Sequence, residues 1–139
     1  MQRKGLDSTM SKTHRAFMLV FTCCFLIGGT NHARDIWQGG LFPYHAVGMS
    51  INAFWTALCP LDFAVAGMVW WRSRPAVLMG LAILLMDVGV NSWIAYFSGL
   101  QLQSFEPLQV QSLFLGFVMS GALFTLGTEP RRDTGTDRR

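Results

Sequence analysis

The sequence predicts an all-α membrane protein, an antiparallel bundle of four transmembrane helices with both termini in the cytoplasm. Of the 139 residues, 51% are hydrophobic and only 14% are charged, against roughly 25% charged residues in an ordinary soluble domain. The charges lie mostly near the two ends of the chain, outside four long apolar windows. This pattern predicts that the solvent around most of the chain is lipid.

The four apolar windows predict spans over about residues 16–36, 47–71, 75–97 and 107–127. At about 1.5 Å per residue, each can cross a hydrocarbon core about 30 Å thick. The first span could instead be a signal peptide, but no suitable small residues follow it, so we expect an uncleaved anchor. Residues 1–15 and 128–139 are predicted to be basic cytoplasmic tails of one membrane domain over 16–127.

The basic residues predict the orientation. If the loops alternate between the two sides, ten of the eleven Lys and Arg residues fall on one side and only Arg34 falls on the other. Because cytoplasmic loops carry the excess of basic residues, both termini are expected in the cytoplasm. No Lys or Arg cluster is interleaved with aromatic residues, which excludes a nucleic-acid surface.

The sequence predicts the shape of two of the connections between the spans. Residues 73–75 (SRP) predict a tight turn, with Pro75 opening the third helix. Residues 38–45 (QGGLFPYH) are turn-rich and partly apolar, so this loop is expected to fold back over the bundle. The joint near residues 98–106 is polar.

The third span contains an aspartate within its longest apolar run. Asp87 and Asn91 are four residues apart, so they share one helix face with Gly80 and Leu84. An aspartate that faces lipid at mid-depth costs roughly 3 kcal/mol. We therefore expect this face to point into the bundle.

The second span repeats this arrangement. One of its faces carries, at helical spacing, Asn52, Thr56, Cys59 and Phe63. Asp62 flanks this face, and Pro60 cannot donate to the carbonyl of Thr56, so a kink is expected there. Asp62 and Asp87 are predicted to lie about 13 and 18 Å above the inner ends of their helices.

These two carboxyl groups are therefore expected at similar depth, and no Lys or Arg lies within the apolar part of any span. Two ionised carboxylates without a basic partner are implausible in a low dielectric, so Asp62 and Asp87 are predicted to share a proton, a water or a cation. The alternative is that these polar side chains only fix the register of the helices. An intramembrane carboxylate is more often functional.

The first span adds His32 and Asp35, three residues apart on the side that also carries Phe21, Phe25 and Gly28. A histidine beside a carboxylate can shuttle protons. The pair can equally form a hydrogen bond at the helix end, at the level of the lipid headgroups.

The fourth span carries a stripe of small and polar residues, namely Gln109, Ser112, Gly116 and Ser120. Ser112, Gly116 and Ser120 are predicted to pack closely on another helix, because small residues let helices approach. The alternative is a substrate path lined by the stripe.

Other kinds of site lack support in the sequence. Cys23, Cys24 and Cys59 form no C-x-x-C pair and no zinc spacing, so they are expected to be small buried hydrophobes. No metal site is predicted, and no phosphate loop or nucleophile elbow suggests a cofactor or an acyl-transfer site. Binding therefore ranks above catalysis.

The chain is similar to small four-span bacterial inner-membrane proteins, and this resemblance implies that its membrane is a bacterial inner membrane. In its span number and in Asp35 and Asp62, it also resembles the EXPERA-type proteins, the emopamil-binding and sigma-2 group. That resemblance implies a sterol isomerase or a ligand-binding protein. The small multidrug exporters differ, because their key glutamate lies in the first span.

Three functions are left open by the sequence. The first is binding or transport of a lipophilic or cationic small molecule at Asp62 and Asp87, and it is favoured. The second is acid/base catalysis on a lipid-like substrate, with Asp62, Asp87 or His32 as the acid or base. The third is a subunit or assembly role, in a homo-oligomer or with a membrane partner, in which the polar stripes bind another helix.

Overall fold

The computed structural model describes residues 12–97 and 106–127. These residues form helices α1 (Lys12–Gly39), α2 (Met49–Met68), α3 (Ser73–Phe97) and α4 (Glu106–Gly127), and no strand occurs among them. All four helices are long and apolar enough to cross a membrane, which confirms the predicted helical class. The predicted tails over 1–11 and 128–139, and the polar joint over 98–105, lie outside the described residues.

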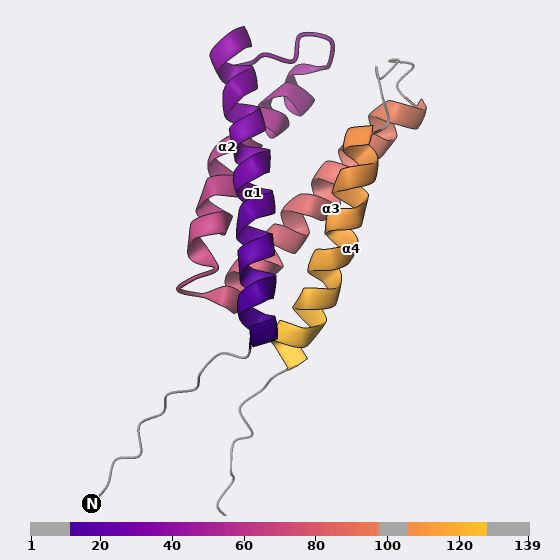
Figure 1. The fold of residues 1–139 in the computed structure, drawn as a ribbon. Helices are drawn as coiled ribbons and strands as arrows, with labels where there is room; N and C mark the ends of the chain where they lie inside the picture. Colours follow the sequence, from indigo (N-terminus) through magenta and orange to yellow (C-terminus); the bar gives the residue numbers. More distant parts are fainter. Residues whose placement is uncertain (1–11, 98–105, 128–139) are drawn as a thin grey trace, which may run out of the picture.

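The helices form two antiparallel pairs. Helix α1 packs mainly on α2 and helix α3 mainly on α4, while contacts between α2 and α3 join the pairs (Figure 1). Helix α1 begins and helix α4 ends at the same end of the molecule, which we call the terminal end (Figure 1). The opposite end, which carries the loop between α1 and α2 over residues 40–48, is called the loop end.

Helix α1 extends beyond the predicted span at both ends. It stops at the loop end where Gly40 adopts a φ of +82°, a left-handed conformation that costs glycine little. The Gly40 N–H donates to the carbonyl of Ile36 over 2.9 Å and closes the helix. His32 and Asp35 lie in the last turns of α1, next to the loop.

The two prolines of the central helices are accommodated differently. Pro60 lies inside α2, which continues through it from Met49 to Met68. Helix α3 begins at Ser73, so Pro75 stands in its first turn, where a missing N–H costs no intrahelical hydrogen bond. The turn is short, as predicted, but it lies over residues 69–72 and not over 73–75, because Ser73, Arg74 and Pro75 already form the first turn of α3.

An aromatic cluster fills the bundle toward the terminal end. Phe17, Phe21 and Phe25 follow one face of α1 at intervals of four residues, and all three are buried. Phe114 and Phe117 of α4 complete the cluster, with ring centroids 5.2 to 6.5 Å from those of the α1 rings. Such rings make large van der Waals contacts, which are the main source of helix association within lipid.

Two glycines make room for these rings. A Cβ at Gly80 of α3 would lie 2.7 Å from the ring of Phe21 and 2.9 Å from that of Phe25, and a Cβ at Gly121 of α4 would overlap the ring of Phe17. Large aliphatic side chains cover the outside of the helices instead, among them Leu19, Ile27, Leu85, Leu113 and Leu123. The molecule is thus apolar outside and closely packed inside, as a lipid-embedded bundle requires.

Candidate functional site

The face of α1 that carries the aromatic cluster becomes polar toward the loop end. Beyond Phe25, the same face presents Gly28, His32 and Asp35 at intervals of three or four residues. His32 and Asp35 are half-buried, whereas Phe25 is buried. The interior of the bundle therefore changes along α1 from an aromatic core to a polar region.

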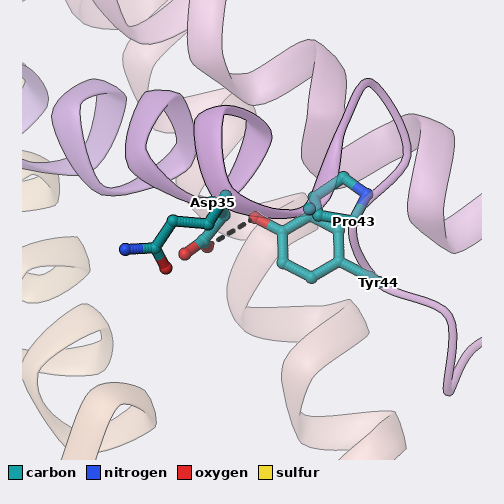
Figure 2. Close-up of a pocket in the computed structure, with 5 residues that line it drawn as sticks. Asp35, Pro43 and Tyr44 are labelled. Atoms are coloured by element: carbon teal, nitrogen blue, oxygen red, sulfur yellow. Dashed lines mark hydrogen bonds between the residues drawn. The ribbon is translucent and has the colours of Figure 1, made fainter.

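Tyr44 joins the two polar residues of α1. Its hydroxyl donates to the Asp35 carboxylate over 2.8 Å (Figure 2) and lies 3.0 Å from Nδ1 of His32. Because the single phenol proton points to Asp35, the His32 contact is a hydrogen bond only if Nδ1 carries a proton and donates it. Burial and the neighbouring Asp35 raise the pKa of Tyr44, so its hydroxyl remains a donor.

Two polar side chains of α2 hold the loop that carries Tyr44. Asn52 accepts a hydrogen bond from the Tyr44 backbone N–H and donates one to the carbonyl of Phe42, each over 3.2 Å. The hydroxyl of Thr56 lies 2.9 Å from the carbonyl of Leu41. The loop therefore folds back onto α1 and α2, as the sequence predicted.

A second polar cluster links α3 to α4. One oxygen of the Asp87 carboxylate accepts from Asn91 over 3.0 Å, and the other accepts from Gln111 over 2.8 Å. Asn91 also donates to the side-chain oxygen of Gln111 over 2.8 Å, which closes the triangle. Trp55 of α2 lies beside Asp87 in the same lining. The carboxylate is thus held by donors from two helices, α3 and α4.

The two clusters line one cavity of about 260 Å³, which we call the interhelical pocket. Its walls are formed by His32, Asp35, Tyr44, Trp55, Asp87, Asn91 and Gln111, so every helix and the α1–α2 loop contribute. A neighbouring loop pocket of about 300 Å³ is lined by Asp35, Gln38, Gly39, Pro43 and Tyr44 (Figure 2). Asp35 and Tyr44 belong to both pockets and stand between them.

The chemistry of the interhelical pocket favours a positively charged organic ligand. Its lining contains two carboxylates and no Lys or Arg. The rings of Tyr44 and Trp55 meet edge to face, with centroids 4.9 Å apart, and aromatic faces attract cations. Within the described part of the chain, no group of three His, Cys, Asp or Glu residues could hold a metal ion.

Asp62 lies near this pocket but outside its lining. It is only 6% exposed, as is Asp87, so both acids face inward as predicted. The Asp62 carboxylate packs against α1, where a Cβ at Gly28 would come within 2.7 Å of it. The two carboxyl groups are near enough for their charges to interact, but they do not share one cavity.

The structure thus brings together four of the residues singled out in the sequence, namely His32, Asp35, Asp87 and Asn91. Asn52 and Thr56 do not line the interhelical pocket, because their side chains bind the loop backbone. The sequence analysis missed Tyr44, Trp55 and Gln111. Gln111 continues the stripe of Phe114, Val118 and Ala122 toward the loop end, and this apolar spacing was the signal that could have identified it.

The predicted packing stripe of α4 does not pack on the other described helices. Ser112, Gly116 and Ser120 are exposed, and the two serine hydroxyls donate to backbone carbonyls of their own helix. Helix α4 instead turns Val118 and Gly121 inward. A contact of the stripe with another chain stays a prediction.

Comparisons with known proteins return no relative. No family model matches the chain, and no curated protein and no solved structure is significantly similar to it.

Proposed function

We propose that this protein is a multi-pass membrane protein that binds a small organic cation in the interhelical pocket. The observation that carries the proposal is the placement of the Asp87 carboxylate beside Trp55 and Tyr44, in a lining without Lys or Arg. A carboxylate supplies the opposite charge, and the aromatic rings supply the cation–π attraction that quaternary ammonium groups favour. The EXPERA-type resemblance, which also implies ligand binding, points the same way.

Preorganisation of the acid supports this proposal. Asn91 and Gln111 each hold one oxygen of Asp87, so the carboxylate needs no rearrangement when a ligand arrives. Each of its two oxygens already accepts a hydrogen bond, which favours a ligand recognised by charge and shape over one that must donate several hydrogen bonds.

The location of the pocket sets the side from which a ligand enters. From the excess of basic residues near the two ends, we infer that both termini lie in the cytoplasm of a bacterial cell. The interhelical pocket then opens on the outer side, because its residues lie on the half of α1 that is remote from Lys12. The aromatic cluster around Phe21 closes the path to the inner side. This arrangement corresponds to outward-facing binding, and transport requires a second conformation.

Calorimetry on the full chain in lipid nanodiscs tests the proposal. Benzyltrimethylammonium is a suitable probe because its charge is independent of pH, and neopentylbenzene is its neutral carbon isostere. We expect the cation to bind and the neutral isostere to bind at least about tenfold more weakly. Asp87→Asn should lower the affinity for the cation about tenfold or more, which corresponds to about 1.4 kcal/mol. Gln109→Ala, at an exposed position of α4, is the control. Failure of the cation to bind, or equal affinity for both probes, overturns the proposal.

A second candidate function is acid/base catalysis on a lipid-like substrate. The chain of hydrogen bonds from His32 through Tyr44 to Asp35 favours it, because such a chain can move a proton. Catalysis requires that a lipid extract incubated with the protein yields a product. In that case His32→Gln should stop turnover while ligand binding persists.

A further inference from the structure

Asp62 is a buried acid without a partner for its charge. Its side chain is only 6% exposed, and no hydrogen-bond donor among the described residues reaches its carboxylate. Asp87 is equally buried, yet it accepts hydrogen bonds from Asn91 and Gln111. The two acids therefore differ in how well their surroundings stabilise a negative charge.

The neighbours of Asp62 favour its neutral form. Asp87 of α3 presents a second carboxylate, Cys59 is the nearby titratable group on α2 itself, and α1 presents the glycines Gly28 and Gly29. None of these groups is a cation. Of two interacting acids in an apolar interior, the one that lacks donors holds the proton and the one with donors holds the charge.

We propose that Asp62 carries a proton that is released when an organic cation enters the interhelical pocket. This inference rests on the proposed function. Burial away from water is the main cause that keeps Asp62 neutral, and repulsion by the charge of Asp87 adds to it. The bound cation offsets the charge of Asp87, which removes this repulsion and favours ionisation of Asp62. The O–H bond of the Asp62 carboxyl group then breaks, the proton passes to water, and the electron pair remains on the carboxylate. The charge of the site is unchanged, since one positive charge enters as one leaves.

Thermodynamic linkage makes this exchange reciprocal. If cation binding expels the proton, a higher proton concentration must weaken cation binding by the same coupling free energy. Asp62 would then convert a binding protein into a cation/proton exchanger, provided that the bundle can also open toward its terminal end.

Calorimetry with benzyltrimethylammonium, repeated in buffers of different ionisation enthalpy, measures the protons released per cation bound. We expect the wild-type chain to release up to one proton and to bind the cation more tightly as the pH rises. Asp62→Asn should bind the cation without this release and with less pH dependence. Cys59→Ala is the matched control, because Cys59 is the titratable neighbour of Asp62 on α2 and lies outside the interhelical pocket, and this variant should still release the proton.

The outcomes separate this inference from the function on which it rests. Absence of cation binding to the wild-type chain overturns both. Cation binding without proton release overturns the inference alone, and this result needs no variant that must fold. Release that persists in Asp62→Asn assigns the proton to another group and also contradicts the inference.

Discussion

Gln111 of α4 donates a 2.8 Å hydrogen bond to the carboxylate of Asp87 of α3. The two residues lie on different helices, 24 positions apart in the chain, so this bond ties the α3–α4 pair together beside the interhelical pocket. Asn91 donates to both of them, which gives the pair a closed polar triangle. The triangle stabilises the helix pair and also sets the position of the acid that we assign to the ligand.

Replacement of Gln111 tests the structural part of this role. Gln111→Ala removes a donor from a buried carboxylate, and hydrogen bonds between membrane helices contribute on the order of 1 kcal/mol. We expect the free energy of unfolding in mixed micelles to fall by about that amount. Gln109→Ala, at an exposed position on the same helix, should change it by less than about 0.5 kcal/mol. Equal effects of the two substitutions would refute the assigned geometry.

Gly121 tests the packing of the aromatic cluster. A methyl group there overlaps the ring of Phe17, which is buried and cannot move away freely. We expect Gly121→Ala to destabilise the protein by about 1–3 kcal/mol, as overpacking usually does.

The matched control for Gly121 is Gly116 on the same helix. No atom would lie within 4 Å of a Cβ at Gly116, so Gly116→Ala should be neutral, or stabilising by up to about 1 kcal/mol through helix propensity. Thermal unfolding of both variants in the same detergent makes the comparison. If Gly116→Ala lowered the thermal stability more than Gly121→Ala does, the stripe of Ser112, Gly116 and Ser120 would have to pack on another chain.

The helical fold was largely predictable because its cause is local. The apolar windows have the length and composition of membrane spans, and the four observed helices coincide with them. The ends of α1 were less predictable. The apolar window predicted an end at about residue 36, whereas the helix continues to Gly39 because nothing breaks it before Gly40.

Alkaline titration tests the environment of Tyr44. The sequence holds two tyrosines, so Tyr96→Phe leaves Tyr44 as the only one. Because burial and Asp35 raise its pKa, the absorbance of the phenolate should develop at higher pH than in a free tyrosine. The hydrogen bond to Asp35 therefore contributes fully below the ordinary tyrosine pKa and is lost as the pH rises through the elevated one.

Asp35→Asn in the same Tyr96→Phe background is the control for this titration. The amide keeps the size of the side chain but removes the negative charge and weakens the hydrogen bond, so the midpoint should move back toward that of a free tyrosine. A midpoint unaffected by Asp35→Asn would show that Tyr44 does not lie beside this carboxylate.

Hydrogen exchange tests the attachment of the loop. The backbone N–H of Tyr44 donates to the side chain of Asn52, so Asn52→Ala should speed exchange of this amide about tenfold or more, if the bond is worth about 1.4 kcal/mol. Ser50→Ala, exposed near the start of α2, should leave it unchanged. If the Tyr44 amide exchanged equally fast in the wild-type chain, the hydrogen bond between Tyr44 and Asn52 would be contradicted.

The candidate site was less predictable than the fold, because it depends on which helices are neighbours. The inward direction of Asp87 follows from the cost of facing lipid, and spacing places Asn91 beside it. Spacing within one helix does not reveal that Gln111 meets Asp87, nor that Asn52 binds the loop. Tyr44 was missed because it lies in a loop, where helical periodicity gives no direction.

Nuclear Overhauser contacts of benzyltrimethylammonium with the full chain in nanodiscs test the location of the proposed cation site most directly. We expect its methyl protons to contact the indole of Trp55 and the ring of Tyr44, which line the interhelical pocket. Trp37 and Trp71 serve as internal controls, since they are 90% and 85% exposed and lie outside the pocket. Contacts confined to these two exposed indoles would place the cation in the membrane interface and contradict a site at Asp87.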